Sequence, residues 1–229
     1  MSLFGFRPKD DERPDDTAWP QATWPPPADV ELRGQVVTLR PITPADHEEL
    51  RRALDFPQVW AHLPTPNPAD AELMGELVDS LQRRGFHPWV LRLTAPFETA
   101  HGELPAGAAV GWSSYLEVSP ADARAEIGNT AYTPSVWGTA VNAEAKLLLL
   151  GYAFEGLGLG RMQLKTDIRN VRSQRAIAGL GATYEGTLRR YQRRADGTVR
   201  DTVLFSITAE EWPDVRRGLE ARVAAGIAH

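Results

Sequence analysis

The feature that most constrains this chain is a strand, a loop, a helix and a second strand that follow one another between residues 125 and 167. The first strand, Ala125 to Thr133, ends before Pro134, because proline has no N–H to donate to a β-ladder. The loop PSVWGTA leads into a helix that we expect to reach about Phe154, and the strand RMQLKTD follows. Such a crossover unit predicts two parallel strands joined by a right-handed connection.

This connection places the helix N-terminus beside the end of the first strand. The first amides of a helix have no partners within the helix, and the helix dipole favours an anion there. The small residues from Gly138 to Ala140 would let a phosphate approach those amides. The alternative is an ordinary capped helix, with Thr139 or Asn142 as the cap and Glu144 favoured in the first turn by the same dipole.

Two phosphate-binding motifs can be compared with this region. The P-loop pattern GxxxxGK[ST] is absent, which argues against a P-loop nucleotide hydrolase. The run GLGLG, Gly156 to Gly160, follows a helix and precedes a strand, the reverse of the order in a dinucleotide-binding motif. We therefore interpret GLGLG as a helix C-terminus and a turn.

The preceding part of the chain predicts further strands and helices. The segment GQVVTLRPI is typical of a strand, and TPADHEELRRAL of a helix with Thr43 as its N-cap. A second helix is expected from about Pro68 to Arg84, where Gly85 ends it. Two strands, Trp89 to Thr94 and Val110 to Val118, should then pair antiparallel.

Composition limits the function classes. The 229 residues, 42% of them hydrophobic, suffice for one sizeable core, and the net charge of −5 argues against a nucleic-acid partner. There is no cysteine and the five histidines are dispersed, so the sequence indicates neither a disulfide framework nor a metal site. Because no segment resembles a signal peptide or a membrane span, we expect a cytoplasmic protein without a membrane partner.

The first 28 residues differ from the rest in being rich in proline and charge. Such a composition favours a flexible tail ahead of a single domain at residues 29–225. The alternative is a strap, in which Trp19 and Trp24 dock on the domain or on a neighbouring subunit.

Two linked motifs resemble those of a known family. The first is EIGNTAYTPSVWGTAVNAEA, and the second combines Asn170, Ser173 and the LGA of residues 180–182. Together they resemble the GNAT superfamily of acyl-CoA-dependent N-acetyltransferases, particularly its RimJ/RimL branch of ribosomal-protein N-terminal acetyltransferases. The resemblance extends from about Val30 to Trp212, since VTLRPIT and DGTVRDTVLFSIT are similar to the first and last strands of the family.

This resemblance implies an α/β (α+β) fold with a mixed, mostly antiparallel sheet of about six to seven strands. Helices would cover both faces, and a parallel pair would form the cofactor cleft. It implies acetyl-CoA as co-substrate, no metal, and direct transfer to a primary amine, either a protein N-terminal α-amino group or a small molecule. A homodimer is expected by analogy. The alternatives are a CoA-binding module without transferase activity and an interaction domain that works through its tryptophan-bearing arm.

The resemblance also implies a cofactor site. Backbone groups of Thr130 to Tyr132 would hold the pantetheine arm and the amides from Gly138 to Asn142 the pyrophosphate, although Trp137, Ala140 and Asn142 depart from the usual loop. Asn170 would bond to the arm, cap the next helix, or do both. Arg169, Arg172 and Arg175 would meet the 3′-phosphate or remain solvated. The cofactor-binding residues expected are Thr130, Tyr132, Trp137, Gly138, Thr139, Ala140, Val141, Asn142, Asn170, Ser173 and Arg175.

Two residues are predicted to be catalytic. Glu126 is the candidate base, and its alternative is a strand carboxylate paired with an arginine. Ser173 is the candidate hydrogen-bond donor to the departing thiolate, since Ile177 stands where relatives carry a tyrosine; Tyr132 and Tyr184 are alternatives. The acceptor side would be walled by residues 55–84 and lined by His62, Trp60 and Trp112, unless these aromatic side chains belong to the core.

Overall fold

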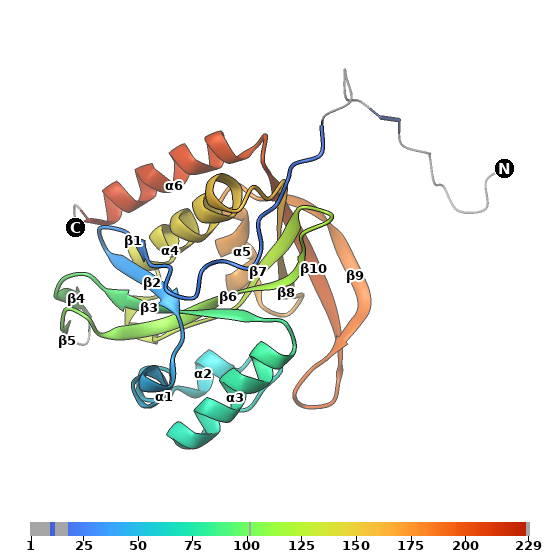
Figure 1. Ribbon diagram of the computed structural model, residues 1–229. Coiled ribbons are helices and arrows are strands. Elements are labelled where there is room, and N and C mark those ends of the chain that lie inside the picture. Colours follow the sequence, from blue (N-terminus) through green and yellow to red (C-terminus); the bar gives the residue numbers. More distant parts are fainter. Residues whose placement is uncertain (1–9, 12–17, 101, 228–229) are drawn as a thin grey trace.

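The computed structural model describes residues 10–11, 18–100 and 102–227, and its centre is an eight-stranded sheet (Figure 1). The strand order is β1-β2-β3-β6-β7-β8-β10-β9, and every pair is antiparallel except β7–β8. The strands are β1 (Leu32–Arg33), β2 (Val37–Pro41), β3 (His87–Leu93), β6 (Ala109–Ser119), β7 (Arg124–Tyr132), β8 (Arg161–Asp167), β9 (Thr183–Arg193) and β10 (Val199–Thr208). A separate hairpin pairs β4 (Phe97–Thr99) with β5 (Gly102–Leu104).

The predicted mixed, mostly antiparallel sheet is confirmed, and so is the parallel pair. The sheet has eight strands where six to seven were expected. The additional strand is β1, which has two residues and is too short to leave an alternating pattern in the sequence.

Helices lie on both faces of the sheet (Figure 1). On one face, α4 (Ala140–Gly151) packs beside α6 (Trp212–Ile227). The other face carries α1 (His47–Ala53), α2 (Pro57–Trp60) and α3 (Ala71–Arg83), while α5 (Val171–Ala178) follows β8. Single turns precede α1 and α4, at Pro44–Asp46 and Pro134–Val136, and a π-turn, Tyr152–Gly156, extends α4. None of the helices in the described ranges is long and apolar enough to cross a membrane.

Each face has its own hydrophobic core. The larger core lies between the sheet and the α4–α6 layer. The smaller core lies under α1–α3 and contains Trp60 and Trp112, whose rings meet edge to face at 5.9 Å. Trp112 is 1% exposed and its indole donates to the Asn129 carbonyl. Trp112 therefore belongs to the core and not to the acceptor wall, because the face that carries it is covered by helices.

The parallel strands β7 and β8 pair over a short length only. The pairs are Arg124 with Arg161, Ala125 with Met162 and Glu126 with Gln163. Three residues further along, Asn129 has a φ of 47°. At this point two residues of β7 lie opposite one residue of β6, an irregularity called a β-bulge. A bulge bends its strand, so β7 turns away from β8 and a gap opens toward the carboxyl ends of both strands.

The loop into α4 is shaped by two residues. Gly138 has a φ of 79°, a left-handed conformation that disfavours any side chain. Thr139 is the N-cap, because its hydroxyl accepts from Val141 N at 3.3 Å, so Asn142 is not the cap. Beyond α4, the predicted helix end and turn at GLGLG is observed, with Gly158 at a φ of 68°.

Residues 18–28 lie against the domain. Trp19 Nε1 donates to the Ala121 carbonyl at 3.0 Å, and Thr23 N donates to the Leu157 carbonyl at 2.8 Å. The ring of Trp24 meets His87 edge to face at 4.6 Å. Residues 1–9 and 12–17, which also belong to the expected N-terminal arm, lie outside the described residues.

Candidate active site

A cavity of about 320 Å³ lies where β7 and β8 separate. Its walls come from both strands, from the loop and first turns of α4, and from the start of α5. Residues before α3 and residues of the β9–β10 hairpin line the same cavity. The gap in the sheet is thus continuous with the N-terminal ends of two helices on one side and with residues of the predicted acceptor wall, such as His62, on the other.

The loop before α4 has room for a ligand. A Cβ added at Gly138 would meet no atom within 4 Å, and Trp137, Gly138 and Asn142 line the cavity. The guanidinium of Arg172 stacks over the Trp137 ring, 3.6 Å from its centroid. Open space, helix amides and a nearby cation are the chemistry that binds a phosphate group, so these residues fit a diphosphate.

Glu126 lies at the last parallel pair, where the gap begins. Its side chain is 6% exposed and lines the cavity. Burial raises the pKa of Glu126 to about 7, even though Lys165 Nζ lies 2.8 Å from its carboxylate. Lys165 also pairs with Glu117 at 2.6 Å, so its charge is shared between two carboxylates. A carboxylate with a pKa near neutrality can both accept and release a proton.

Lys146 projects from α4 toward the bulge. Its Nζ donates to Ser113 Oγ and to Thr130 Oγ1, both at 3.0 Å, and these two hydroxyls are 2.7 Å apart. None of the ion pairs found in the described part of the chain includes Lys146, which is 5% exposed and lines the cavity. Burial lowers the pKa of Lys146 to about 7. The cavity is therefore bordered by an acid and an amine that both titrate near neutral pH.

Comparisons with known proteins identify the family. Residues 37–183 match the family model of the acetyltransferase (GNAT) domain. The chain belongs to the GNAT acetyltransferase family. It is similar to Mycobacterium smegmatis RimJ, solved in complex with CoA-disulfide, at 25% identity and a TM-score of 0.69, over 86% of this chain and 94% of that one.

Two curated relatives match shorter parts of the chain. An uncharacterized N-acetyltransferase p20 of Bacillus licheniformis is 30% identical over 103 residues, which are 45% of this chain and 57% of the relative. The FsC-acetyl coenzyme A-N(2)-transacetylase of Aspergillus fumigatus is 35% identical over 81 residues, or 35% of this chain and 34% of the relative. The chain thus spans about half of one relative and a third of the other.

The cavity brings together most of the residues expected at the site. Glu126, Thr130, Tyr132, Trp137, Gly138, Asn142, Asn170 and Ser173 all line it. Ala140 and Val141 have their side chains in the larger core, so only their backbone could face a ligand. Arg175 is exposed and lies outside the cavity lining, whereas Arg172 lines it through its contact with Trp137.

Asn170 and Ser173 form the N-terminal turn of α5. The Asn170 side chain accepts from Ser173 N at 3.0 Å, so Asn170 is the N-cap of α5. Its amide nitrogen is left for other partners, and Ser173 is half-buried at the cavity wall. The predicted helix-cap role of Asn170 is therefore observed, and it is compatible with a contact to a ligand.

The two alternative tyrosines differ in position. Tyr132 lines the cavity, and its buried hydroxyl has no partner among the residues described. Burial raises the pKa of Tyr132. The Tyr132 carbonyl accepts from the Trp137 indole at 3.0 Å, so one of the backbone groups expected to hold a pantetheine arm already has a partner. Tyr184 is 58% exposed and lies outside the cavity lining.

Three features of the site were not anticipated from the sequence. Lys146 stands four residues after Asn142, the spacing that puts both on one helix face, and this signal was present in the sequence. Glu126 pairs with Lys165 of β8, whereas the alternative to its catalytic role was a pair with an arginine. Glu144, expected to interact with the helix dipole, instead accepts from the amides of Gln35, Val36 and Val37 at 2.6–2.7 Å.

Proposed function

We propose that this acetyltransferase transfers an acetyl group from acetyl-CoA directly to a primary amine, with a protein N-terminal α-amino group as the first acceptor class to test. The observation that carries the proposal is the separation of β7 from β8 after three pairs, beside the open loop at Gly138. A relative with this fold was solved with CoA-disulfide, which supports a CoA ligand in the cleft.

The cofactor contacts follow from the cavity lining. The loop from Gly138 to Asn142 would hold the diphosphate, and the edge of β7 at Thr130 would hold the pantetheine arm. Arg172, already beside the loop, would add the cation that the loop itself lacks. Acetyl-CoA supplies the thioester, and the protein supplies its alignment with the amine.

The amine must lose a proton to react. An α-amino group with a pKa of about 7.7 to 8.0 is roughly 10 to 15% neutral at pH 7, whereas a lysine amine is far below 1% neutral. A weak base therefore suffices for an N-terminal acceptor. Glu126 takes this proton, directly or through a water molecule, because its pKa of about 7 suits a base at neutral pH.

The departing thiolate needs a proton or a hydrogen bond, and two groups at the cavity can supply it. The Ser173 hydroxyl lies at the α5 wall, and the Lys146 ammonium lies at the bulge. With a pKa of about 7, the Lys146 ammonium is more acidic than a thiol with a pKa of about 8.5, so the transfer is downhill. Ser173 acts mainly by hydrogen bonding.

The proposal is tested by thiol release from acetyl-CoA in the presence of a panel of N-terminal peptides and small amines. Each peptide is matched by a copy whose α-amine is blocked and whose internal lysine is free. We expect thiol release with the free α-amine only. Release with small amines alone would favour a small-molecule acceptor.

Calorimetry with acetyl-CoA, run beside the thiol-release assay, separates acetyl transfer from cofactor binding. If acetyl-CoA binds by calorimetry but no amine of the panel releases thiol, the protein is a CoA-binding module and the transfer proposal is wrong. Ser173→Ala is measured alongside. Turnover near that of the wild type, with an unaltered pH profile, would remove Ser173 from the reaction while leaving the cofactor site intact.

A further inference from the structure

Arg200, near the start of β10, lies at the junction of two cavities. It lines the main cavity and also a second one of about 400 Å³, which lies between residues 57–66 and the β9–β10 hairpin. His62, Leu63, Pro64 and Asp167 line both cavities as well, so the two adjoin. A ligand that enters between the α2 region and the hairpin would therefore pass Arg200 on its way to the gap in the sheet.

The Arg200 guanidinium forms no direct ion pair in the described part of the chain, and the charges of Asp167 and Glu126 act on it only from a greater distance. Its Nε is buried without a hydrogen-bond partner. The neighbouring carboxylates are already used: Asp167 accepts from Arg194 at 2.6 and 2.9 Å, and Glu126 pairs with Lys165 at 2.8 Å. Burial lowers the pKa of Arg200. A partly desolvated guanidinium without an anion is unfavourable, and an anionic ligand would remove that cost.

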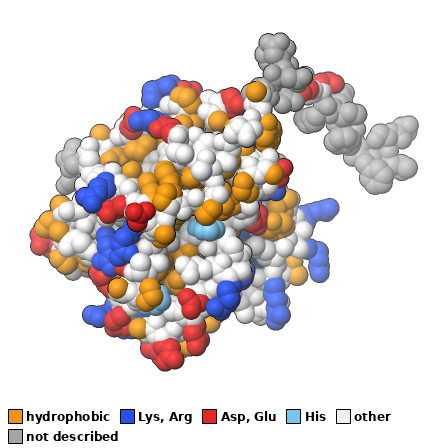
Figure 2. All heavy atoms as spheres, viewed as in Figure 1, with side chains coloured by type: hydrophobic (Ala, Val, Ile, Leu, Met, Phe, Trp, Pro, Cys, Tyr) orange, Lys and Arg blue, Asp and Glu red, His pale blue; other side chains and the backbone are white. Residues whose placement is uncertain are grey.

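The surroundings of Arg200 carry a surplus of positive charge. Arg193, Arg194 and Arg200 line the second cavity with only two carboxylates, Asp167 and Asp196. Arg194 pairs with Asp167, and Asp196 accepts from Thr198 N and Oγ1 at 2.9 and 2.7 Å. Lys and Arg side chains also gather over the hairpin on the outer surface (Figure 2). The second cavity is thus suited to an anion.

The anion belongs either to acetyl-CoA or to the acceptor. The loop residues that fit the diphosphate, Trp137, Gly138 and Asn142, line the main cavity but not the second one. The second cavity is instead bordered by residues 57–66, which lie in the segment predicted to wall the acceptor side. We propose that the acceptor amine carries a carboxylate, and that Arg200 binds this carboxylate at the junction of the two cavities. The inference rests on the proposed acetyl transfer and specifies its acceptor.

A guanidinium binds a carboxylate with two parallel N–H donors. The test uses matched acceptors that differ only in this charge: peptides with Asp or Asn as the second residue, and an amino acid beside its carboxamide. We expect kcat/KM to favour the carboxylate member by about tenfold or more, mainly through KM, as for other charged hydrogen bonds.

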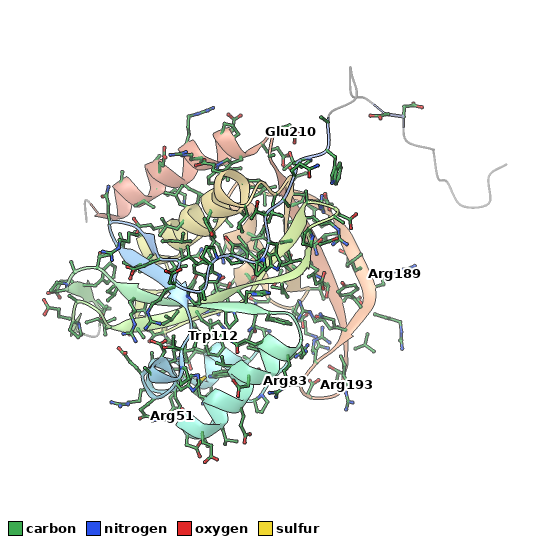
Figure 3. All side chains as sticks on the ribbon, viewed as in Figure 1. Arg51, Arg83, Trp112, Arg189, Arg193 and Glu210 are labelled. Atoms are coloured by element: carbon green, nitrogen blue, oxygen red, sulfur yellow. The ribbon has the colours of Figure 1, made fainter. Side chains whose placement is uncertain are left out.

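Three variants sharpen the test. Arg200→Gln should lose the preference, and Arg200→Lys should keep part of it, because the charge stays while the paired donors are lost. Arg189→Gln is the matched control. Arg189 lies on the same β9–β10 hairpin, its side chain extends outward from the sheet, and it lines neither cavity (Figure 3). Arg189→Gln should behave as the wild type does.

Calorimetry with CoA bound and the carboxylate-bearing amine as titrant gives a readout that needs no turnover. The affinity should fall about tenfold in Arg200→Gln and stay unchanged in Arg189→Gln. If the wild type used the carboxylate acceptor and its amide counterpart equally well, or if the preference for the carboxylate survived in Arg200→Gln, the inference would be overturned. Weaker binding of acetyl-CoA in Arg200→Gln would assign the anion to the cofactor and also overturn it. Arg200-dependent amine binding without any thiol release would instead contradict the transfer proposal and leave the carboxylate site standing.

Discussion

Lys146 Nζ lies 3.0 Å from Thr130 Oγ1, on the bulged part of β7 that follows its last pair with β8. The amine therefore connects α4 to the edge of the gap in the sheet. Because Ser113 Oγ of β6 completes the cluster, β6, β7 and α4 are joined by three hydrogen bonds beside the gap.

This arrangement predicts a pH-dependent stability. Burial lowers the pKa of Lys146 from 10.5 to about 7, so between these values the unfolded chain binds more protons than the folded one. The free energy of unfolding of the wild type should therefore rise as the pH increases from about 7 toward 10, by up to about 1.4 kcal/mol per pH unit. Lys146→Met should lack this slope in urea denaturation at several pH values. Parallel curves for the two proteins would show that Lys146 is not held with a lowered pKa.

Glu126→Gln should lower turnover and flatten the pH profile. Because burial raises the pKa of Glu126 to about 7, the wild-type rate should increase through this pH as the carboxylate loses its proton. We expect a loss of about a hundredfold in kcat, at the low end for a general base. Glu117→Gln is the control, since Glu117 pairs with the same Lys165 and lines the same cavity, but its side chain is 42% exposed against 6% for Glu126. An equal effect of both variants would mean that Glu126 acts only through Lys165.

Gly138→Ala should weaken acetyl-CoA binding. Its φ of 79° strains any side chain, and the added methyl group would enter the open space beside the cavity. Gly107→Ala is the matched control, because Gly107 has a φ of 81°, open space around its Cβ and a position in the turn before β6. Both variants should lose about 1 kcal/mol of stability, but only Gly138→Ala should raise the dissociation constant for acetyl-CoA in calorimetry. Equal affinities would contradict the loop assignment.

Glu144→Gln should destabilise the fold without touching the cavity. Its carboxylate accepts from three backbone amides before and within β2, and an amide side chain would leave one of them facing an N–H group. The expected loss is about 2 kcal/mol of unfolding free energy, since a buried donor is left unsatisfied. Glu220→Gln, which removes an exposed pair with Arg216, should cost less than about 0.5 kcal/mol. Similar costs for the two variants would show that the Glu144 contacts add little.

Much of the fold could be predicted from the sequence because local signals agreed with one another. Pro134 marked the end of β7, and Thr43, predicted as an N-cap, does begin the first helical turn. The crossover from β7 through α4 to β8 followed from the handedness of such connections. The family motifs then placed Asn170 and Ser173 at the same cavity as Glu126.

The remaining features depend on contacts between distant residues. At the bulge in β7 the positive φ falls on Asn129 and not on the preceding Gly128, because asparagine tolerates this conformation, so the glycine alone does not locate it. Glu144 meets residues more than 100 positions earlier in the chain, and the charge on Arg200 matters only because Arg194 already occupies Asp167. No periodicity or local motif records such pairings.

A crystal structure of the protein with acetyl-CoA tests the cofactor site most directly. We expect the diphosphate at the amides from Gly138 to Asn142, the pantetheine arm in the gap beside Thr130, and the thioester near Lys146 and Glu126. A nucleotide bound elsewhere, or an α4 N-terminus that stays covered by protein while the cofactor is bound, would contradict this expectation.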